Sequence, residues 1–428
     1  MAHPPTRRDF VKTASAITLG LAATGFAPRL RAASSPGNKL VVAVLGMGRG
    51  FDHVKALQQI EGVEIAYLCD VDESWFARVV KSFDGKKQAA PTTVKDFRTI
   101  LDDKSVDAIF VATPNFWHAP ITILACAAGK HVYVEKPGSH NPQEGEWMVA
   151  AARKYNRVVQ MGNQRRSWPG VIEAVDKLKA GAIGKVTFAR GFYTNARASI
   201  GRGKPAPVPV GLDYALWQGP TPERPYVDNL VHYNWHWRWH WGGGELANNG
   251  PHALDLMRWG LGVELPKRVA YNGGRYHYDD DQESPDTGVA TYDFGTCGAS
   301  WDHSSCNPRS GESVPFVAWY GENGMRMEQI ASGYKVFDGR GKLVDQGTGP
   351  GGDVVHIQNF LDSIRGKAKP NSEIAVGQTS SLLCHLGNIS YRTGHTLAFD
   401  PVKRRILDDR EAAKLWRREY RKGWEPKV

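Results

Sequence analysis

Residues 39–70 constrain the fold of this chain more than any other stretch. An apolar, β-rich run leads into Gly46-Met47-Gly48-Arg49-Gly50, and residues 51–60 then show the apolar spacing of a helix. A second apolar run, 63–68, ends in Cys69-Asp70. Strand, glycine-rich turn, helix, strand and acid in this order predict the first unit of a doubly wound parallel sheet.

The residues of this unit also suit the binding of a dinucleotide. Gly46 permits the tight turn, Gly48 lets the backbone approach a pyrophosphate, and the helix N-terminus offers unpaired N–H groups. Asp70 lies near the spacing expected for the acid that binds a ribose 2′-hydroxyl, and its charge would repel a 2′-phosphate. NAD is therefore expected rather than NADP. Gly50 comes one position early and Phe51 stands where the usual pattern has glycine, so we expect the local helix–strand packing to differ.

Strand and helix patterns alternate up to residue 161, which predicts a mostly parallel sheet with helices on its faces. Helical patterns occupy 94–101, 119–128 and 142–155, and strand patterns occupy 106–111, 131–135 and 157–161.

The strand over 131–135 ends in Glu135-Lys136-Pro137. In open α/β sheets, ligands bind beyond the carboxyl ends of the strands, so Lys136 is a candidate for contacting the ligand. Pro137 restricts the backbone of the residue before it, and Lys136 is expected to be extended. The alternative is a strand-end lysine in water.

With Gly46–Gly50, Asp70, Thr113-Pro114-Asn115 and Glu135-Lys136-Pro137 in this order, the chain resembles the Gfo/Idh/MocA family of nicotinamide-dependent sugar and polyol oxidoreductases. The resemblance implies an α/β protein: an N-terminal Rossmann doubly wound parallel sheet, then a C-terminal α+β domain with an open, mainly antiparallel sheet. Further matching segments are 181–186, 242–255 and 354–365.

The resemblance also assigns residues to the cofactor. It implies that Asn115 and Glu135 flank the nicotinamide ribose, and that Lys136 reaches both the cofactor and a substrate hydroxyl. The full set of expected NAD-binding residues is Gly46, Gly48, Arg49, Gly50, Asp70, Thr113, Asn115, His118, Glu135 and Lys136.

A second set of chemical residues lies in Gly243–Asp255. Oxidation of an alcohol by NAD needs a base for the hydroxyl proton, and a histidine of near-neutral pKa suits this task. His252 matches the histidine of the family's Asp-x-x-x-His pattern, and with Lys136 it is the expected catalytic pair. Asn248 stands at the Asp position, which removes a negative charge from beside the base. A buried packing histidine is the alternative for His252.

Tryptophan and other residues alternate over His232–Trp241. An extended segment is expected, with Trp235, Trp237, Trp239 and Trp241 on one side, lining a carbohydrate cleft. A tryptophan-rich core or a subunit contact is the alternative. A helical reading would align His232, His236 and His240 for a metal, but no acidic or cysteine partner is spaced to complete it, so no metal is expected. The candidate substrate residues are Gln164, Arg165, Asn195, Trp235, His236, Asn248 and His252.

The N-terminus carries Arg7-Arg8-Asp9-Phe10-Val11-Lys12 before a mild apolar run, 13–27. It resembles a twin-arginine export signal, and the run is too short and too rich in small residues for a spanning helix. Periplasmic location is expected, with cleavage around 27–34 and no membrane attachment afterwards. A disordered basic arm is the alternative.

The formal charge of +10 lies mainly in residues 1–33 and 401–428, and the nearly neutral body argues against nucleic-acid binding. The five cysteines form no CxxC pair and are expected to be mainly buried thiols, with a Cys297–Cys306 disulfide left open. The acidic turn 281–287 is expected to be a solvated loop, and 408–420 an amphipathic helix docked on the body.

We expect a signal peptide over 1–33, an NAD-binding Rossmann domain over 36–165, a substrate domain over 166–350 and C-terminal helices over 351–428 that pack back on the body. The hypothesis is an exported, homo-oligomeric NAD(H)-dependent oxidoreductase of a sugar, polyol or glycoside. Because little free NAD is expected outside the cytoplasm, it would fold around NAD and keep it. The alternatives are a redox-neutral NAD-dependent glycosidase, which oxidises, eliminates and reduces in turn, and a sugar-binding relative without activity.

Overall fold

The first sheet of the computed structural model, which describes residues 39–428, has six parallel strands in the order β3-β2-β1-β4-β5-β6. The order reverses direction between β1 and β4, which is the topological switch point where ligands bind in doubly wound folds. The strands are β1 Leu40–Leu45, β2 Val63–Cys69, β3 Thr92–Val94, β4 Ala108–Val111, β5 His131–Val134 and β6 Val159–Met161.

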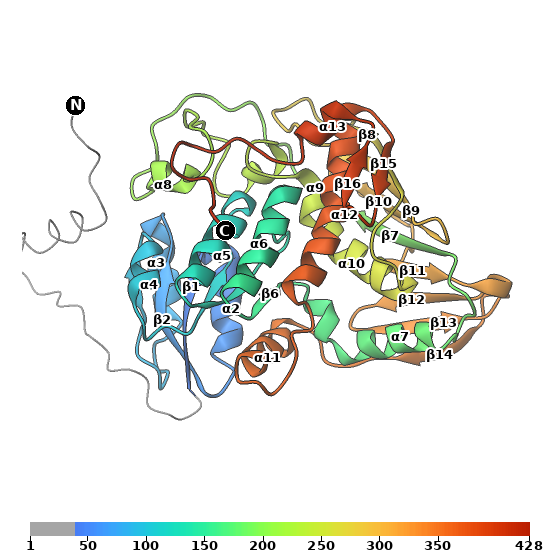
Figure 1. Cartoon of the computed structure of the whole chain (residues 1–428), viewed down its shortest axis with the longest axis horizontal. Coiled ribbons are helices and arrows are strands. Elements are labelled where there is room, and N and C mark those ends of the chain that lie inside the picture. Colours follow the sequence, from blue (N-terminus) through green and yellow to red (C-terminus); the bar gives the residue numbers. More distant parts are fainter. Residues whose placement is uncertain (1–38) are drawn as a thin grey trace, which may run out of the picture. The chain divides into compact units, whose positions relative to one another are not determined.

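Helices cover both faces of this sheet (Figure 1). One face packs against α4 (Arg98–Asp102), α5 (Asn115–Ala127) and α6 (Pro142–Lys154). The other packs against α2 (Met47–Leu57), α3 (Phe76–Lys81) and α11 (Asp353–Ile364). Because strands buried on both faces need apolar residues throughout, β1 and β4 read as continuous hydrophobic runs.

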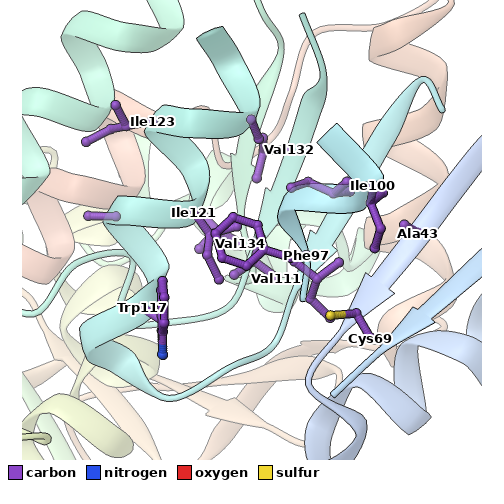
Figure 2. Packing of buried hydrophobic residues seen from close by; sticks show 14 of the residues in the cluster. Ala43, Cys69, Phe97, Ile100, Val111, Trp117, Ile121, Ile123, Val132 and Val134 are labelled. Carbon is purple, nitrogen blue, oxygen red and sulfur yellow. The ribbon is translucent and has the colours of Figure 1, made fainter. Parts of the chain in front are cut away.

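Figure 2 shows the first of these layers from close by. Val111, Val132 and Val134 point from neighbouring strands toward Ile121 on α5, and all four are fully or almost fully buried. Dense apolar packing of this kind holds the ends of β4 and β5 in a fixed relation, and the residues that follow these strands inherit that relation.

The second sheet, counted over residues 39–428, has ten strands in the order β14-β13-β12-β11-β7-β10-β9-β8-β15-β16. All neighbouring pairs are antiparallel except β7 and β10. Its strands are β7 Phe188–Thr194, β8 Arg268–Gly274, β9 Thr287–Asp293, β10 Gly298–Ser304, β11 Val317–Tyr320, β12 Arg326–Ile330, β13 Gly333–Phe337, β14 Leu343–Gly347, β15 Leu397–Asp400 and β16 Arg405–Leu407. The fold class expected from the sequence is confirmed.

Three helices cover one face of the second sheet: α7 (Pro169–Lys179), α10 (Gly250–Leu261) and α12 (Ile374–Thr393). Their apolar residues meet Tyr271, Trp301 and Trp319 of the sheet. The helix α12 also contacts α6 and β6 of the first domain. A buried ion pair joins the linker after β6 to α10: Nε of Arg166 donates to both carboxylate oxygens of Asp255, at 3.0 and 2.7 Å.

The C-terminal tail lies against the first domain. Arg418 forms an ion pair with Glu144 at 2.6 Å, Tyr420 donates to the same carboxylate at 2.7 Å, and Trp424 packs edge-on against Trp117. The predicted helix over 408–420 is mostly wrong, because only α13 (Arg410–Lys414) is helical. These contacts require an extended chain that reaches across the surface.

Two other local expectations also change. Val94 ends β3 and the following helix begins only at Arg98, so the helix expected over 94–101 is shorter. The cysteines of the described region are all free, which excludes the Cys297–Cys306 disulfide.

No helix within residues 39–428 is long and apolar enough to cross a membrane. The twin-arginine motif falls outside the described residues.

Candidate active site

The residues that follow the parallel strands converge on one cleft of about 840 Å³. Gly46 follows β1, Asp70 follows β2, Thr113 comes after β4, Glu135 and Lys136 follow β5, and Gln164 comes after β6. Parallel strands present their carboxyl ends at one edge, so residues far apart in the chain become neighbours. The second domain closes the cleft with Tyr233, Trp235, His236, Asn248 and His252.

The three glycines of the glycine-rich turn have different surroundings, so a side chain would meet a different obstacle, or none, at each position. Gly46 has φ 84°, and a Cβ there would lie 2.5 Å from the carbonyl oxygen of Ala112. A Cβ at Gly50 would lie 2.9 Å from Cγ1 of Val44, so Gly50 allows α2 to pack on β1. Gly48 lines the cleft and would meet nothing within 4 Å. The open space above Gly48 and the N-terminus of α2 fit a pyrophosphate.

Asp70 holds the end of β2 against this turn. Its carboxylate accepts from the backbone N–H of Met47 at 2.6 Å and from that of Asp72 at 3.0 Å. Burial raises the pKa of Asp70, and the two N–H donors oppose that rise. The carboxylate also lines the cleft, where its remaining acceptor capacity fits a ribose hydroxyl.

Glu135 is a buried carboxylate with three side-chain partners. Its Oε1 accepts from Nε of Arg49 at 3.0 Å, lies 2.9 Å from Nε2 of His53, and lies 3.4 Å from Nε2 of Gln164. Burial alone would raise the pKa of Glu135, but Arg49 and His53 outweigh burial and hold the pKa well below its ordinary value. Glu135 is therefore a fixed negative charge at the floor of the cleft.

Lys136 crosses from the first domain to the second. Its Nζ donates to the backbone oxygen of Asn248 at 2.7 Å and to Oδ1 of the same residue at 3.1 Å. Burial lowers the pKa of Lys136 from its ordinary value, and Glu135 opposes that change. Asn248 thus positions the ammonium without neutralising it.

His252 lies in the first turn of α10, beside Asn248 in the cleft. Its ring forms no hydrogen bond with any side chain or backbone group in the described part of the chain. Burial, Lys136 and Arg165 lower the pKa of His252 well below its ordinary value, and the positive end of the helix acts in the same direction. The imidazole is neutral at pH 7 and can accept a proton.

The aromatic segment is not the extended strand that alternation predicts. Asn234–Trp237 forms the 3₁₀ turn η3, and the indoles of the segment point into different neighbourhoods. Trp241 packs against Trp217, and Trp239 against Tyr391, while Trp235 stacks on His236. Burial of Trp235, Trp237 and Trp241 outweighs the period-two pattern. Of the four tryptophans expected in the cleft, only Trp235 lines it, whereas both substrate candidates of this segment, Trp235 and His236, do so.

The three histidines of this segment have separate partners. His232 Nε2 lies 2.8 Å from Asp72, His236 Nδ1 2.6 Å from the carbonyl of Tyr233, and His240 Nε2 2.9 Å from the carbonyl of Pro222. No group of three or more His, Cys, Asp or Glu side chains suited to a metal ion occurs in residues 39–428.

The structure brings most of the sequence-predicted site residues to the cleft. Asn195 is exposed and outside the cleft, where its amide donates to the hydroxyl of Tyr193 at 2.9 Å. Gly50 packs on β1 behind the turn. His118 is buried, with its ring nitrogens 2.6 Å from the Pro137 oxygen and 2.8 Å from the Thr113 oxygen. The predicted residues that line the cleft are Gly46, Gly48, Arg49, Asp70, Thr113, Asn115, His118, Glu135, Lys136, Gln164, Arg165, Trp235, His236, Asn248 and His252.

Sequence reasoning missed three residues of the site. His53 lies one helical turn after Arg49, and that spacing could have indicated a shared partner. Asp353, at the start of α11, accepts from Arg49 at 2.6 Å, and no local pattern connects it with the turn. The hydroxyl of Tyr233 accepts from Arg197 at 3.0 Å at the rim.

The acidic turn over 281–287 is not solvated, so that expectation is wrong. Asp286 is fully buried and accepts from the backbone N–H of Tyr276 at 2.9 Å. Asp281 accepts from Arg238 at 3.0 Å and from the backbone of Gly203 at 2.7 Å. The carboxylates hold the turn against neighbouring loops, because cationic and N–H donors surround them.

Comparison with known proteins agrees with this two-domain oxidoreductase arrangement. A family model described as "Oxidoreductase family, NAD-binding Rossmann fold" matches residues 40–163, and its companion "C-terminal alpha/beta domain" matches 178–293 and 340–426. The chain is thus an oxidoreductase with an NAD-binding domain. It belongs to the Gfo/Idh/MocA family, and its cofactor is NAD.

Two solved structures share the fold. The aldose-aldose oxidoreductase of Caulobacter crescentus, complexed with glycerol, superposes with a TM-score of 0.66 at 20% identity, over 84% of this chain and 100% of that one. The WlbA dehydrogenase of Bordetella pertussis, in complex with NADH and UDP-GlcNAcA, gives a TM-score of 0.65 at 18% identity, over 86% and 99% of the two chains.

Among curated proteins, the alpha-N-acetylgalactosaminidase of Shewanella oneidensis is 26% identical over 212 residues. The match covers 45% of this chain and 46% of that protein. The chain therefore spans about half the length of the curated relatives it matches.

Alanine substitutions at Gly46 and Gly48 should have different effects on stability and on NAD binding. Gly46→Ala should lower the free energy of unfolding by about 2 kcal/mol or more, because it combines a left-handed backbone with a Cβ clash. Gly48→Ala should unfold like the wild type but bind NAD at least about tenfold more weakly, because its methyl group projects into the pyrophosphate space. Thermal unfolding and NAD titration measure the two effects. Wild-type NAD affinity in Gly48→Ala would contradict this placement of the cofactor.

Proposed function

We propose that this protein oxidises a hydroxyl-bearing carbon of a sugar, polyol or glycoside, using NAD that it retains. The single observation that carries the proposal is the pairing of Lys136 and His252 in the cleft that follows the glycine-rich turn. One is a cation held by Asn248, and the other is a neutral base whose ring has no partner among residues 39–428.

The residues of the cleft have separate roles in binding the substrate and in moving its proton. When bound, NAD supplies the acceptor and donor of hydride. His252 takes the hydroxyl proton, because its neutral imidazole lines the cleft and has no hydrogen-bond partner among residues 39–428. Lys136 donates a hydrogen bond to the substrate oxygen and stabilises the negative charge that develops there. Trp235 and His236 offer aromatic surface for the C–H face of a sugar ring.

A second candidate function has support from the relatives. Proteins named as members of glycosyl hydrolase family 109, one of them an alpha-N-acetylgalactosaminidase, share 26–27% identity with part of this chain. In a redox-neutral route, oxidation of one carbon acidifies the neighbouring C–H, the leaving group is eliminated, water adds, and hydride returns. The same His252 and Lys136 would manage the protons of each step.

We also propose export and cofactor retention. The basis is Arg7-Arg8-Asp9-Phe10-Val11-Lys12, which lies outside the described residues. A twin-arginine signal would carry a folded protein with NAD already bound to the periplasm. A homo-oligomer remains part of the proposal.

Replacing His252 by Ala should lower turnover by about 10²–10⁴-fold, the usual contribution of a general base, while NAD stays bound. His277→Ala, which changes an exposed histidine of the second domain, is the matched control and should behave as the wild type. Steady-state rates and bound nucleotide are measured on the same preparations. Unchanged turnover in His252→Ala would remove His252 from the mechanism.

Product analysis separates the possible functions. The redox-neutral route predicts that a glycoside is hydrolysed to a sugar of unchanged oxidation state, with no second substrate and no net change in the bound nucleotide. Net oxidation predicts a keto sugar or lactone, formed continuously only when a second substrate restores the nucleotide. If no product forms from glycosides, free sugars or polyols, the remaining hypothesis is a sugar-binding protein without enzymatic activity.

A further inference from the structure

Arg165 is a cation without a partner in the cleft. Its guanidinium lies 4.4 Å from the ring centre of Phe316 and 5.1 Å from that of Trp168. The Arg165 side chain forms no hydrogen bond or ion pair within residues 39–428, and its Nε is buried without a partner. The aromatic rings orient the guanidinium and attract it weakly, but they bring no countercharge.

Three other buried or partly buried arginines near the cleft have carboxylate partners. Arg166, the next residue, holds Asp255 at 2.7 Å, and Arg197 holds Glu245 at 2.8 Å. Arg49 binds both Glu135 and Asp353. An arginine left unpaired beside these is costly in the free protein, and burial lowers its pKa to about 10. Such a cation is favourable when a ligand supplies the anion.

Lys136 adds a second positive charge to the same end of the cleft, and the negative charges of Glu135 and Glu245 offset it only in part. Its ammonium has only the neutral Asn248 as hydrogen-bond partner in the part of the chain that the structure describes. An aspartate in place of Asn248, as in the family's Asp-x-x-x-His pattern, would neutralise the charge of Lys136. The carboxylates that line the cleft are engaged elsewhere: Glu135, Asp353 and Asp52 with Arg49, and Asp70 with backbone N–H groups.

The phosphates of NAD are not the natural partner of Arg165. The glycine turn follows β1, whereas Arg165 follows β6, three strands away in the sheet order. Three strand spacings amount to roughly 14 Å. Arg165 instead lies near His252, where its charge contributes to the lowered pKa of the imidazole. Its position is that of a substrate contact.

We infer that the substrate is a sugar or glycoside that carries an anionic group, and that Arg165 binds this oxyanion in the cleft. The inference rests on the proposed function, because it names the substrate class of the same site. A carboxylate of a uronic acid or a sulfate ester would present two oxygens to the guanidinium fork. The inference also explains why asparagine replaces aspartate at position 248, because the neutral Asn248 leaves the positive charge of Lys136 available to the same anionic substrate.

The test compares matched neutral and acidic ligands on the NAD-loaded protein. Isothermal titration measures methyl glucoside against methyl glucuronide, methyl galactoside against methyl galacturonide, and each neutral glycoside against its 6-sulfate. The variants are Arg165→Gln, Arg165→Lys, which keeps the charge, and Arg340→Gln, an exposed arginine of the β13–β14 turn, as control. NAD affinity and turnover of the same ligands are recorded for every protein.

The inference predicts that the wild type and Arg340→Gln prefer at least one acidic ligand over its neutral match by about tenfold or more. Arg165→Gln should lose roughly 10- to 100-fold for the acidic ligand, with neutral binding and NAD affinity unchanged, and Arg165→Lys should retain part of the preference. Preference for the uronide or for the sulfate ester identifies the oxyanion.

No preference in any pair, a preference that survives in Arg165→Gln, or loss of NAD from that variant would overturn the inference. The proposed function stands or falls separately. If acidic sugars bind but are not converted, the result supports the anionic ligand class and contradicts the proposed enzymatic activity. If neutral sugars are converted and no acidic ligand is preferred, the result supports the enzymatic activity and contradicts the anionic ligand class.

Discussion

The buried carboxylate of Glu135 is the interaction on which the cleft depends. It joins the end of β5 to α2 through Arg49 and His53, and Arg49 extends the link to Asp353 at the start of α11. A buried charge of this kind is tolerated only with several partners. Removal of Glu135 would break the link from β5 to α2 and leave Arg49 with Asp353 and Asp52 alone. The arrangement fixes Lys136, the next residue, at the border between the cofactor turn and the second domain.

Electrostatic asymmetry follows from this arrangement. On the cofactor side, Glu135 and Asp353 neutralise Arg49 and leave the turn at Gly48 free for a pyrophosphate. On the substrate side, Arg165 has no carboxylate partner among the described residues, and Lys136 is hydrogen-bonded only to the neutral Asn248. The positive charges of both help keep His252 neutral. One end of the cleft is therefore suited to a dinucleotide and the other to proton transfer from an anionic sugar.

Much of this could be predicted from the sequence, because it is encoded locally. The order of glycine turn, acid and Glu135-Lys136 marks consecutive strand ends, and parallel strands bring their ends together whatever the loops do. The extended strand predicted over 232–241 is wrong, because Trp241 and Trp239 pack against distant partners, Trp217 and Tyr391, that no local pattern indicates. Asp353 and the isolation of Arg165 carry no local signal, since both depend on which side chains tertiary folding brings near.

We propose that the protein keeps NAD as a resident group rather than exchanging it. The most direct measurement purifies the mature protein without added cofactor, records the absorbance band of reduced nicotinamide, and identifies the nucleotide released on denaturation. One NAD or NADH per chain is the expected result. An empty protein that binds added NAD only weakly would contradict it, and would indicate a freely exchanging dehydrogenase or a fold that has lost its activity.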